Sequence, residues 1–209
     1  MVSAWKDLFL KPPASNLVLI SQPSTDVSEP DAQTIDLERL RRRHEDAFES
    51  LVQQHERLVA ALAQSMGFRG ADLDDAVMEV FANAYLALPR FEGRSSLQTW
   101  LYRIAIRSLG KLKSRRRSEF AVAADLETAS PSAAPSTAVE DREINQRLWD
   151  AVAALDPRSA SALELFYRQG WTIPQIAPVL ECPEGTVKTI LFRAREALRK
   201  VLGTMEVHP

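Results

Sequence analysis

Cysteine and histidine are scarce in this chain. Its 209 residues include 1 cysteine, Cys182, and 3 histidines, His44, His55 and His208. A single cysteine excludes an internal disulfide, and the scattered histidines lack the spacing of metal ligands. We therefore expect no structural metal and no cofactor. The stability of the fold should come from packing of the apolar residues, which make up 45% of the chain.

Long apolar runs are also missing. No stretch approaches the roughly 18–20 consecutive apolar residues that cross a bilayer. The first residues, 1–6, lack the basic start and the continuous apolar block of a secretory signal. These absences predict a cytoplasmic protein that is not inserted into a membrane.

Catalytic motifs are absent as well: there is no phosphate-binding glycine loop and no paired nucleophile and base. Four carboxylates, Asp72, Asp74, Asp75 and Glu79, would suit a metal-dependent enzyme. They fall in the first turns of a predicted helix, however, where negative charge stabilises the helix dipole. We therefore predict that the chain is not an enzyme, and an acidic docking face for a basic protein stays open.

The charge that is present is sorted along the chain. The overall balance is only −2, yet residues 91–117 contain 8 basic residues and 1 acidic residue, whereas residues 118–143 contain 1 basic and 6 acidic residues. Neutralising phosphates releases counterions and is the main sequence-independent source of affinity for nucleic acid. The basic block therefore predicts a surface that binds polyanions.

Helical periodicity predicts an all-α protein with two small helical domains joined by a flexible linker. Residues 1–45 are expected to be a flexible extension and 46–117 the first domain. The acidic linker covers 118–143, where Ala, Ser, Thr and Pro fill more than half of the positions. The second domain covers 144–203, and 204–209 form a tail.

In the first domain, Asp72 can cap a helix that Pro89 ends, and the next helix begins near Leu97. Its outward side is basic. Trp100 is either a core residue, by its spacing, or an aromatic platform for an unpaired base. The preceding loop, residues 91–96, either caps the helix or cradles a base.

The second domain contains the pattern of a helix-turn-helix. Thr172 and Gln175 predict a capping box, Pro178 predicts a kinked or shortened first helix, and a long second helix follows the turn. Arg193 is suited to a guanine and Phe192 to a thymine methyl group in the major groove. A helical hairpin with a solvated outer face is the simpler alternative. The outward residues of the second helix are Lys188, Thr189, Phe192 and Arg193.

Taken in order, these motifs resemble the extracytoplasmic-function (ECF) sigma factors of bacterial RNA polymerase. The resemblance covers about residues 46–117 and 144–202. Arg107, Lys111 and Met78 depart from the residues common in the family, which predicts an unusual preference at the minus-ten element and an unusual contact with the polymerase. The motifs that carry the resemblance are Asp72–Asp75 with Glu79–Phe81, Phe91–Ser96 with Thr99–Ala105, Leu155–Arg158, Ile176–Ala177, Gly185–Lys188, Phe192–Arg195 and Leu198–Arg199.

The resemblance implies three binding partners: core RNA polymerase, promoter DNA and an anti-sigma protein that holds the factor inactive. It also implies site residues. A stand-alone helix-turn-helix regulator, whose first domain dimerises or binds a ligand, is the main alternative, and an RNA-binding or adaptor protein is a remoter one. The implied polymerase-binding residues are Asp72, Asp75, Glu79 and Phe81; the minus-ten residues are Phe91, Arg94, Ser95, Ser96, Trp100, Arg103 and Arg107; the minus-thirty-five residues are Lys188, Thr189, Phe192 and Arg193.

Overall fold

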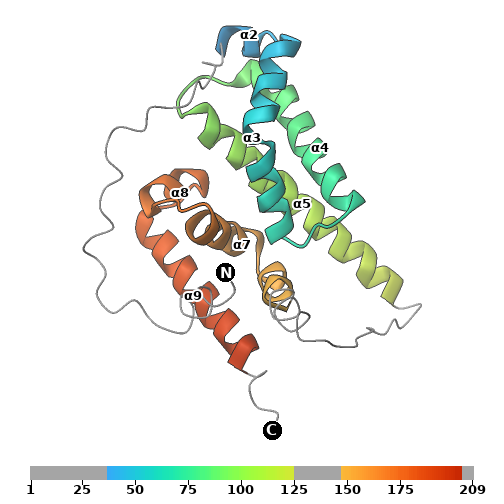
Figure 1. Ribbon diagram of the computed structural model, residues 1–209, viewed down its shortest axis with the longest axis vertical. Helices are drawn as coiled ribbons and strands as arrows, with labels where there is room; N and C mark the ends of the chain where they lie inside the picture. Colours follow the sequence, from blue (N-terminus) through green and yellow to red (C-terminus); the bar gives the residue numbers. More distant parts are fainter. Residues whose placement is uncertain (1–36, 125–146, 204–209) are drawn as a thin grey trace, which may run out of the picture.

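The computed structural model describes residues 37–124 and 147–203 (Figure 1). Within these two ranges the regular structure is helical and no strand occurs, which confirms the predicted all-α class. None of the helices in the described ranges is both long enough and apolar enough to cross a membrane. The predicted tail and most of the predicted extension and linker lie outside the described residues.

The first module is a bundle of three long helices with two short ones at one end. Buried leucines, among them Leu51, Leu62 and Leu101, fill the space between the long helices. The elements are α2 (Leu37–Arg41), α3 (Glu45–Ser65), α4 (Ala71–Ala87), the 3₁₀ turn η1 (Leu88–Arg90) and α5 (Leu97–Ala124).

A short helix lies where the sequence predicted a flexible segment. Helix α2 lies inside the predicted flexible extension, and that prediction is wrong from residue 37 onward. The side chain of Leu40 is fully buried, and α2 contacts both α3 and η1. Leu40 is the only buried residue of α2. A single apolar residue shows no helical periodicity, so the sequence pattern could not predict this helix. Packing against α3 holds it in place.

Helix α5 continues seven residues past the predicted start of the linker at 118 and ends at Ala124. Residues 118–124 include three alanines and one glutamate and contain neither proline nor glycine, and alanine has the highest helix propensity. Glu119 also lies 3.9 Å from Arg115, one helical turn earlier. The first seven residues of the predicted linker therefore continue helix α5.

The second module begins with a helical segment at residues 147–154 and continues through four elements. Asp156 caps the start of α7, because its carboxylate accepts hydrogen bonds from the backbone N–H groups of Arg158 and Ser159. The capping box of Thr172 and Gln175 is confirmed. The elements are α7 (Pro157–Leu163), the π turn η2 (Glu164–Arg168), α8 (Ile173–Val179) and α9 (Glu184–Gly203).

The π turn was not foreseen, and it places a carboxylate in the core. Glu164 is 1% exposed. Burial raises the pKa of this carboxyl, while hydrogen bonding by Gln169 and the positive charge of Arg168 oppose the rise. The guanidinium of Arg168 in turn stacks on the ring of Trp149, 4.7 Å from its centroid. The buried charge is therefore paired and not isolated.

Pro178 lies near the end of a short helix. Helix α8 has seven residues, and Pro178 is the last but one. Proline has no backbone N–H and donates no hydrogen bond there, while the N–H of Leu180 still donates to the carbonyl of Ile176. Shortening of the helix by Pro178 stays a prediction.

The two modules lie against each other (Figure 1). Helices α7 and α8 contact α5, and α7 also contacts α3, so that buried residues of both modules belong to one apolar cluster. The ring centroids of Tyr102 in α5 and Trp171, just before α8, are 5.6 Å apart.

Candidate nucleic-acid interface

Helix α9 presents the predicted DNA-reading residues to the solvent. Lys188, Thr189, Phe192 and Arg193 are all exposed, and the Phe192 side chain has 57% of its surface accessible. The Thr189 hydroxyl donates a hydrogen bond to the carbonyl of Gly185, one turn earlier. The opposite side of the helix faces the core, where Val187, Leu191, Ala194 and Leu198 are buried.

The turn before α9 fixes the position of this face. The backbone N–H of Cys182 donates to the carbonyl of Ala177, and that of Val187 donates to the carbonyl of Pro183, which joins α8 to α9 through a tight corner. Arg158 adds a hydrogen bond to the carbonyl of Leu180 at 2.6 Å. A rigid corner of this kind lets the first turns of the second helix enter a major groove.

The basic side of α5 is in a different environment, because two of its predicted site residues contact the second module. Arg103 donates from Nε to the carbonyl of Pro178 at 2.8 Å. Arg107 forms an ion pair with Glu181 in the turn of the helix-turn-helix. Further along α5, the ammonium group of Lys113 donates to the carbonyls of Ala153 and Leu155.

Lys113 shows the electrostatic effect of this contact. Burial lowers the pKa of its ammonium group, Arg117 lowers it further, and the negative charge of Asp156 opposes the decrease. The ammonium group of Lys113 thus caps the end of the helical segment 147–154.

The loop before α5 performs the capping function that the sequence left open. The Ser96 hydroxyl oxygen accepts a hydrogen bond from the backbone N–H of Thr99 at 3.1 Å. Phe91 is buried, and its ring centroid is 5.1 Å from that of the partly buried Trp100. Arg94 is exposed and Ser95 is partly buried, and Arg94 forms an ion pair with Glu92 at 2.9 Å.

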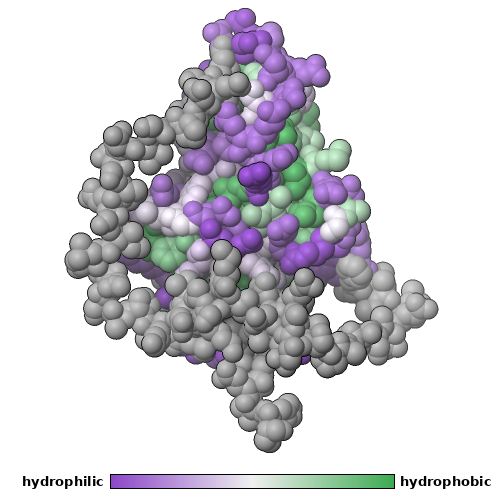
Figure 2. All heavy atoms as spheres, in the orientation of Figure 1, coloured by the Kyte–Doolittle hydropathy of each residue, from purple (hydrophilic) through white to green (hydrophobic). Residues whose placement is uncertain are grey.

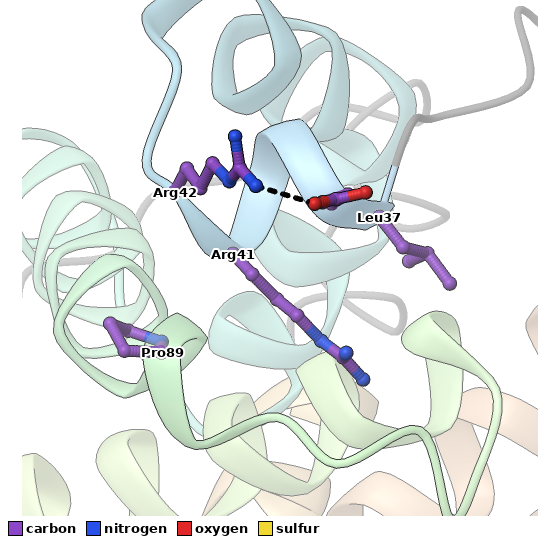
Figure 3. Close-up of a pocket in the computed structure, with 5 residues that line it drawn as sticks. Leu37, Arg41, Arg42 and Pro89 are labelled. Atoms are coloured by element: carbon purple, nitrogen blue, oxygen red, sulfur yellow. Dashed lines mark hydrogen bonds and ion pairs between the residues drawn. The ribbon is translucent and has the colours of Figure 1, made fainter.

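Sequence reasoning missed Arg41, which approaches this loop from α2. Its guanidinium lies 5.8 Å from the centroid of the Phe91 ring. A Cβ atom placed on Gly93 would be 3.5 Å from the same guanidinium. Figure 3 shows Arg41 pointing toward the loop, beside an open pocket lined by α2 and Pro89. No pattern signal marks Arg41, since only the fold brings α2 to the loop.

The acidic start of α4 is solvent-facing but differs in detail from the prediction. Asp72 does not cap the helix, since Gly70 occupies the N-cap position. The Asp72 carboxylate instead forms an ion pair with Arg116 of α5. Asp75 is exposed and Glu79 is partly exposed, 3.9 Å from Arg115.

Helix α4 also carries exposed apolar residues that the sequence analysis did not assign to a surface. The side chains of Met78 and Leu86 have 69% and 64% of their surface accessible. Figure 2 shows apolar residues at the surface where α4 lies, on the right of the view. Phe81 is 6% exposed, so its side chain belongs to the core between the helices.

Comparisons with known proteins match the two modules separately. The family model described as "Sigma-70 region 2" matches residues 51–119. The model described as "Sigma-70, region 4" matches residues 145–198. These ranges contain the basic face of α5 and the outward face of α9, in the same order along the chain.

Two curated relatives match most of the chain. The "ECF RNA polymerase sigma-E factor" of Escherichia coli (strain K12) is 32% identical over 172 residues, which cover 78% of this chain and 90% of the relative. The "RNA polymerase sigma-H factor" of Pseudomonas aeruginosa is 33% identical over 176 residues, covering 79% and 91%.

Two solved structures share the fold. CnrH, in complex with the cytosolic domain of CnrY, is 25% identical, with a TM-score of 0.58 over 83% of this chain and 99% of that one. The sigma factor RpoE of Bartonella quintana, solved with the anti-sigma factor NepR, is 21% identical, with a TM-score of 0.55 over 75% and 96%.

Proposed function

The chain belongs to the ECF sigma factors of RNA polymerase. We propose which of its surfaces bind the polymerase and the promoter. It binds core RNA polymerase and directs transcription initiation at promoters. The order of the two matched regions along one chain carries this conclusion. A stand-alone regulator with an unrelated first domain is not favoured, because region 2 occupies that domain.

Helix α9 is proposed to read the minus-thirty-five element as a duplex. Arg193 can bind a guanine edge in the major groove with two hydrogen bonds, and Phe192 can contact a thymine methyl group. Lys188 and Thr189 lie in the first turns of the same face, where phosphates and base edges are both in reach. The exposure of all four side chains supports this assignment.

The loop before α5 and the adjoining face are proposed to bind the minus-ten element. Arg94, Ser95 and Ser96 supply hydrogen-bonding groups, and Arg103 and Arg107 supply positive charge. Phe91 is buried, so we assign it a positioning role beneath the partly buried Trp100. Arg41 supports the same loop from α2. A base that leaves the stack can be held by stacking and hydrogen bonds, so duplex opening uses binding energy and needs no catalytic group.

Helix α4 is proposed to bind the polymerase. Asp75 and Glu79 provide negative charge, and Met78 and Leu86 provide apolar surface beside it. Large exposed apolar side chains rimmed by charge are typical of protein interfaces. Asp72 lies at the edge of this surface, whereas buried Phe81 supports it from within.

Regulation by an anti-sigma protein in the cytoplasm is part of the proposal. The support is the fold shared with the Bartonella quintana sigma factor that was solved with its anti-sigma factor.

Reconstituted transcription tests the function. The purified chain and core polymerase, without any other sigma factor, should start transcripts at a defined set of genomic promoters, located by mapping transcript 5′ ends. If transcripts start only when a second sigma factor is added, the chain is a regulator and the proposal is wrong.

A charge reversal tests the polymerase surface. Asp75→Arg should weaken binding to core polymerase by about tenfold, equivalent to ~1.4 kcal/mol, because it removes a negative charge and places a positive one on the docking face. Glu49→Arg is the matched control, since Glu49 is exposed on α3. Equal affinities for the two variants, measured by titration with labelled core enzyme, would contradict the assignment.

A further inference from the structure

The turn between α2 and α3 has an arginine at a position whose geometry favours glycine. Arg43 has a φ of 59°, in the left-handed region. Its backbone N–H donates to the carbonyl of Leu40 at 2.9 Å. The N–H of His44 donates to the carbonyl of Arg39 at 3.0 Å. These two hydrogen bonds define a Schellman motif, in which glycine is the usual residue at the left-handed position.

A second turn of the same kind, after α3, provides a comparison. The N–H of Gly67 donates to the carbonyl of Gln64, and the N–H of the next residue donates to the carbonyl of Ala63. Here the left-handed position is glycine, with a φ of 98°. The turn itself therefore needs no side chain. The reason for an arginine at position 43 lies in what its side chain contacts.

The side chain of Arg43 reaches the C-terminal end of α4. Its Nη2 donates to the carbonyl of Leu86 at 3.2 Å, and its guanidinium carbon lies 5.0 Å from the centroid of the Tyr85 ring. Carbonyls in the last turn of a helix lack partners within the helix, and a cation there also suits the helix dipole. The Nε of Arg43 is buried and has no hydrogen-bond partner among the described residues. The side chain keeps this contact in spite of an unpaired donor and an unfavourable backbone.

Arg41 contacts the other end of the same short segment. Element η1 joins the end of α4 to the loop before α5. Arg43 binds a carbonyl before η1, and the guanidinium of Arg41 lies 5.8 Å from the ring centroid of Phe91, directly after it. Arg42, between them, points away and pairs with Glu38 at 2.6 Å (Figure 3). Two arginines from one turn thus contact both ends of the segment that leads into the loop.

We propose that Arg43 is a positioning residue for minus-ten recognition, which together with Arg41 holds the start of the loop before α5 against α2. The inference rests on the proposed binding of the minus-ten strand by that loop. Arg43 acts through the loop and does not itself contact DNA. Phe91 lies at the start of the loop, and its ring centroid is 5.1 Å from that of Trp100. A loop that is held in place before binding loses less motion when it captures a base, so it binds the base more tightly.

The first test separates positioning from stability and uses the free chain without DNA. Arg43→Gly removes the side chain and leaves a residue that prefers the left-handed backbone, so the urea midpoint of unfolding should not fall. The Phe91 amide, which donates to the carbonyl of Leu88 at 2.9 Å, should exchange its hydrogen about three- to tenfold faster. The amide of Phe68, in the turn at Gly67, should be unchanged. An unchanged rate at Phe91 would overturn the inference.

Two further variants control this measurement. Arg42→Ala removes the same charge from the neighbouring exposed residue, whose side chain pairs with Glu38, and should leave the exchange at Phe91 unchanged. Arg41→Ala should speed that exchange as Arg43→Gly does. If Arg42→Ala speeds it equally, net charge and not the contact of Arg43 is responsible, and the inference is wrong.

The second test measures binding of DNA by the holoenzyme. One fluorescent probe is single-stranded DNA that covers the minus-ten element of a promoter located by transcript mapping, and the other is a duplex that carries only its minus-thirty-five element. Arg43→Gly should weaken binding of the single strand by about five- to tenfold, comparable with partial loss of one stacked base. Its affinity for the duplex should stay within about twofold of the unmodified protein. Arg42→Ala should change neither affinity.

The two probes also separate the possible failures. An unchanged affinity of Arg43→Gly for the single strand overturns the inference, and so does an equal loss on both probes, because that result indicates damage to the whole chain. Failure of the proposed function looks different. Arg94→Ala in the loop would then leave single-strand binding unchanged, while the Phe91 amide would still respond to Arg43→Gly.

Discussion

The outward face of α9 and the basic face of α5 carry similar residue types, but their surroundings differ. Both present basic side chains and one aromatic residue. On α9 the four candidate residues are exposed, whereas on α5 the guanidinium groups of Arg103 and Arg107 already contact the second module. Charge and spacing thus determine what a helix face can bind. Only its neighbours determine whether that face is available.

The largest expected effect tests whether the module that contains α5 and the module that contains α9 unfold separately. Leu101 in α5 and Ile176 in α8 are both fully buried. Each change to alanine should reduce the free energy of unfolding by about 2–5 kcal/mol. Because helices pack mainly within their own module, we expect each substitution to lower the stability of the module that contains it and to leave the other module unchanged. Hydrogen exchange measured helix by helix checks this.

A surface substitution provides the control for this experiment. Leu86→Ala removes a similar volume from an exposed site and should change the stability of neither module by more than about 0.5 kcal/mol. If Leu101→Ala lowers protection in α9 as strongly as in α3, the modules unfold together, and the comparison between separate regions does not hold.

A smaller effect is expected for the reading of bases by α9. Arg193→Ala should cost about 1–3 kcal/mol in binding of the holoenzyme to its promoter and relax the preference at one upstream base. Arg199→Ala, an exposed cation further along the same helix that pairs with Glu196, should leave base preference unchanged. Selection from a randomised upstream element measures both. An unchanged preference for Arg193→Ala contradicts the contact.

The smallest effect concerns the pH dependence of stability in the first module. His55 is hydrogen-bonded to the Tyr102 hydroxyl at 2.9 Å, and burial lowers the pKa of its imidazole below the ordinary 6.5. The unfolded chain therefore binds a proton more readily than the folded one. Stability contributed by the neutral imidazole is present above pH 6.5 and is lost as the pH falls below it.

The loss should be at most about 1.4 kcal/mol per pH unit, the slope for one proton. Burial raises the pKa of Tyr102 to about 12, so the hydroxyl stays protonated throughout this range. His55→Gln should flatten the dependence of unfolding free energy on pH between 7 and 5.5, whereas exposed His44→Gln should not. Urea titrations at several pH values measure the difference, and parallel curves for the two variants would count against the assignment.

The sequence was informative wherever a signal is local. The capping box of Thr172 and Gln175 depends on residues within one helical turn, and it is confirmed. The sequence was misleading where a contact is distant. Asp72 pairs with Arg116, which is 44 residues away, and Gly70, not Asp72, takes the N-cap position of α4. Likewise, no local pattern marks α2 as ordered.

The sequence by itself determined that this is an all-helical protein with a basic helix, a helix-turn-helix and the order of motifs of an ECF sigma factor. Periodicity, caps and charge are properties of short segments, so they can be recognised from the sequence without knowledge of the fold. Tertiary structure alone decided that Phe81 and Phe91 are buried, that Arg41 reaches the loop before α5, and that Glu181 faces Arg107. These facts depend on how helices distant in the chain pack together, which no segment encodes alone.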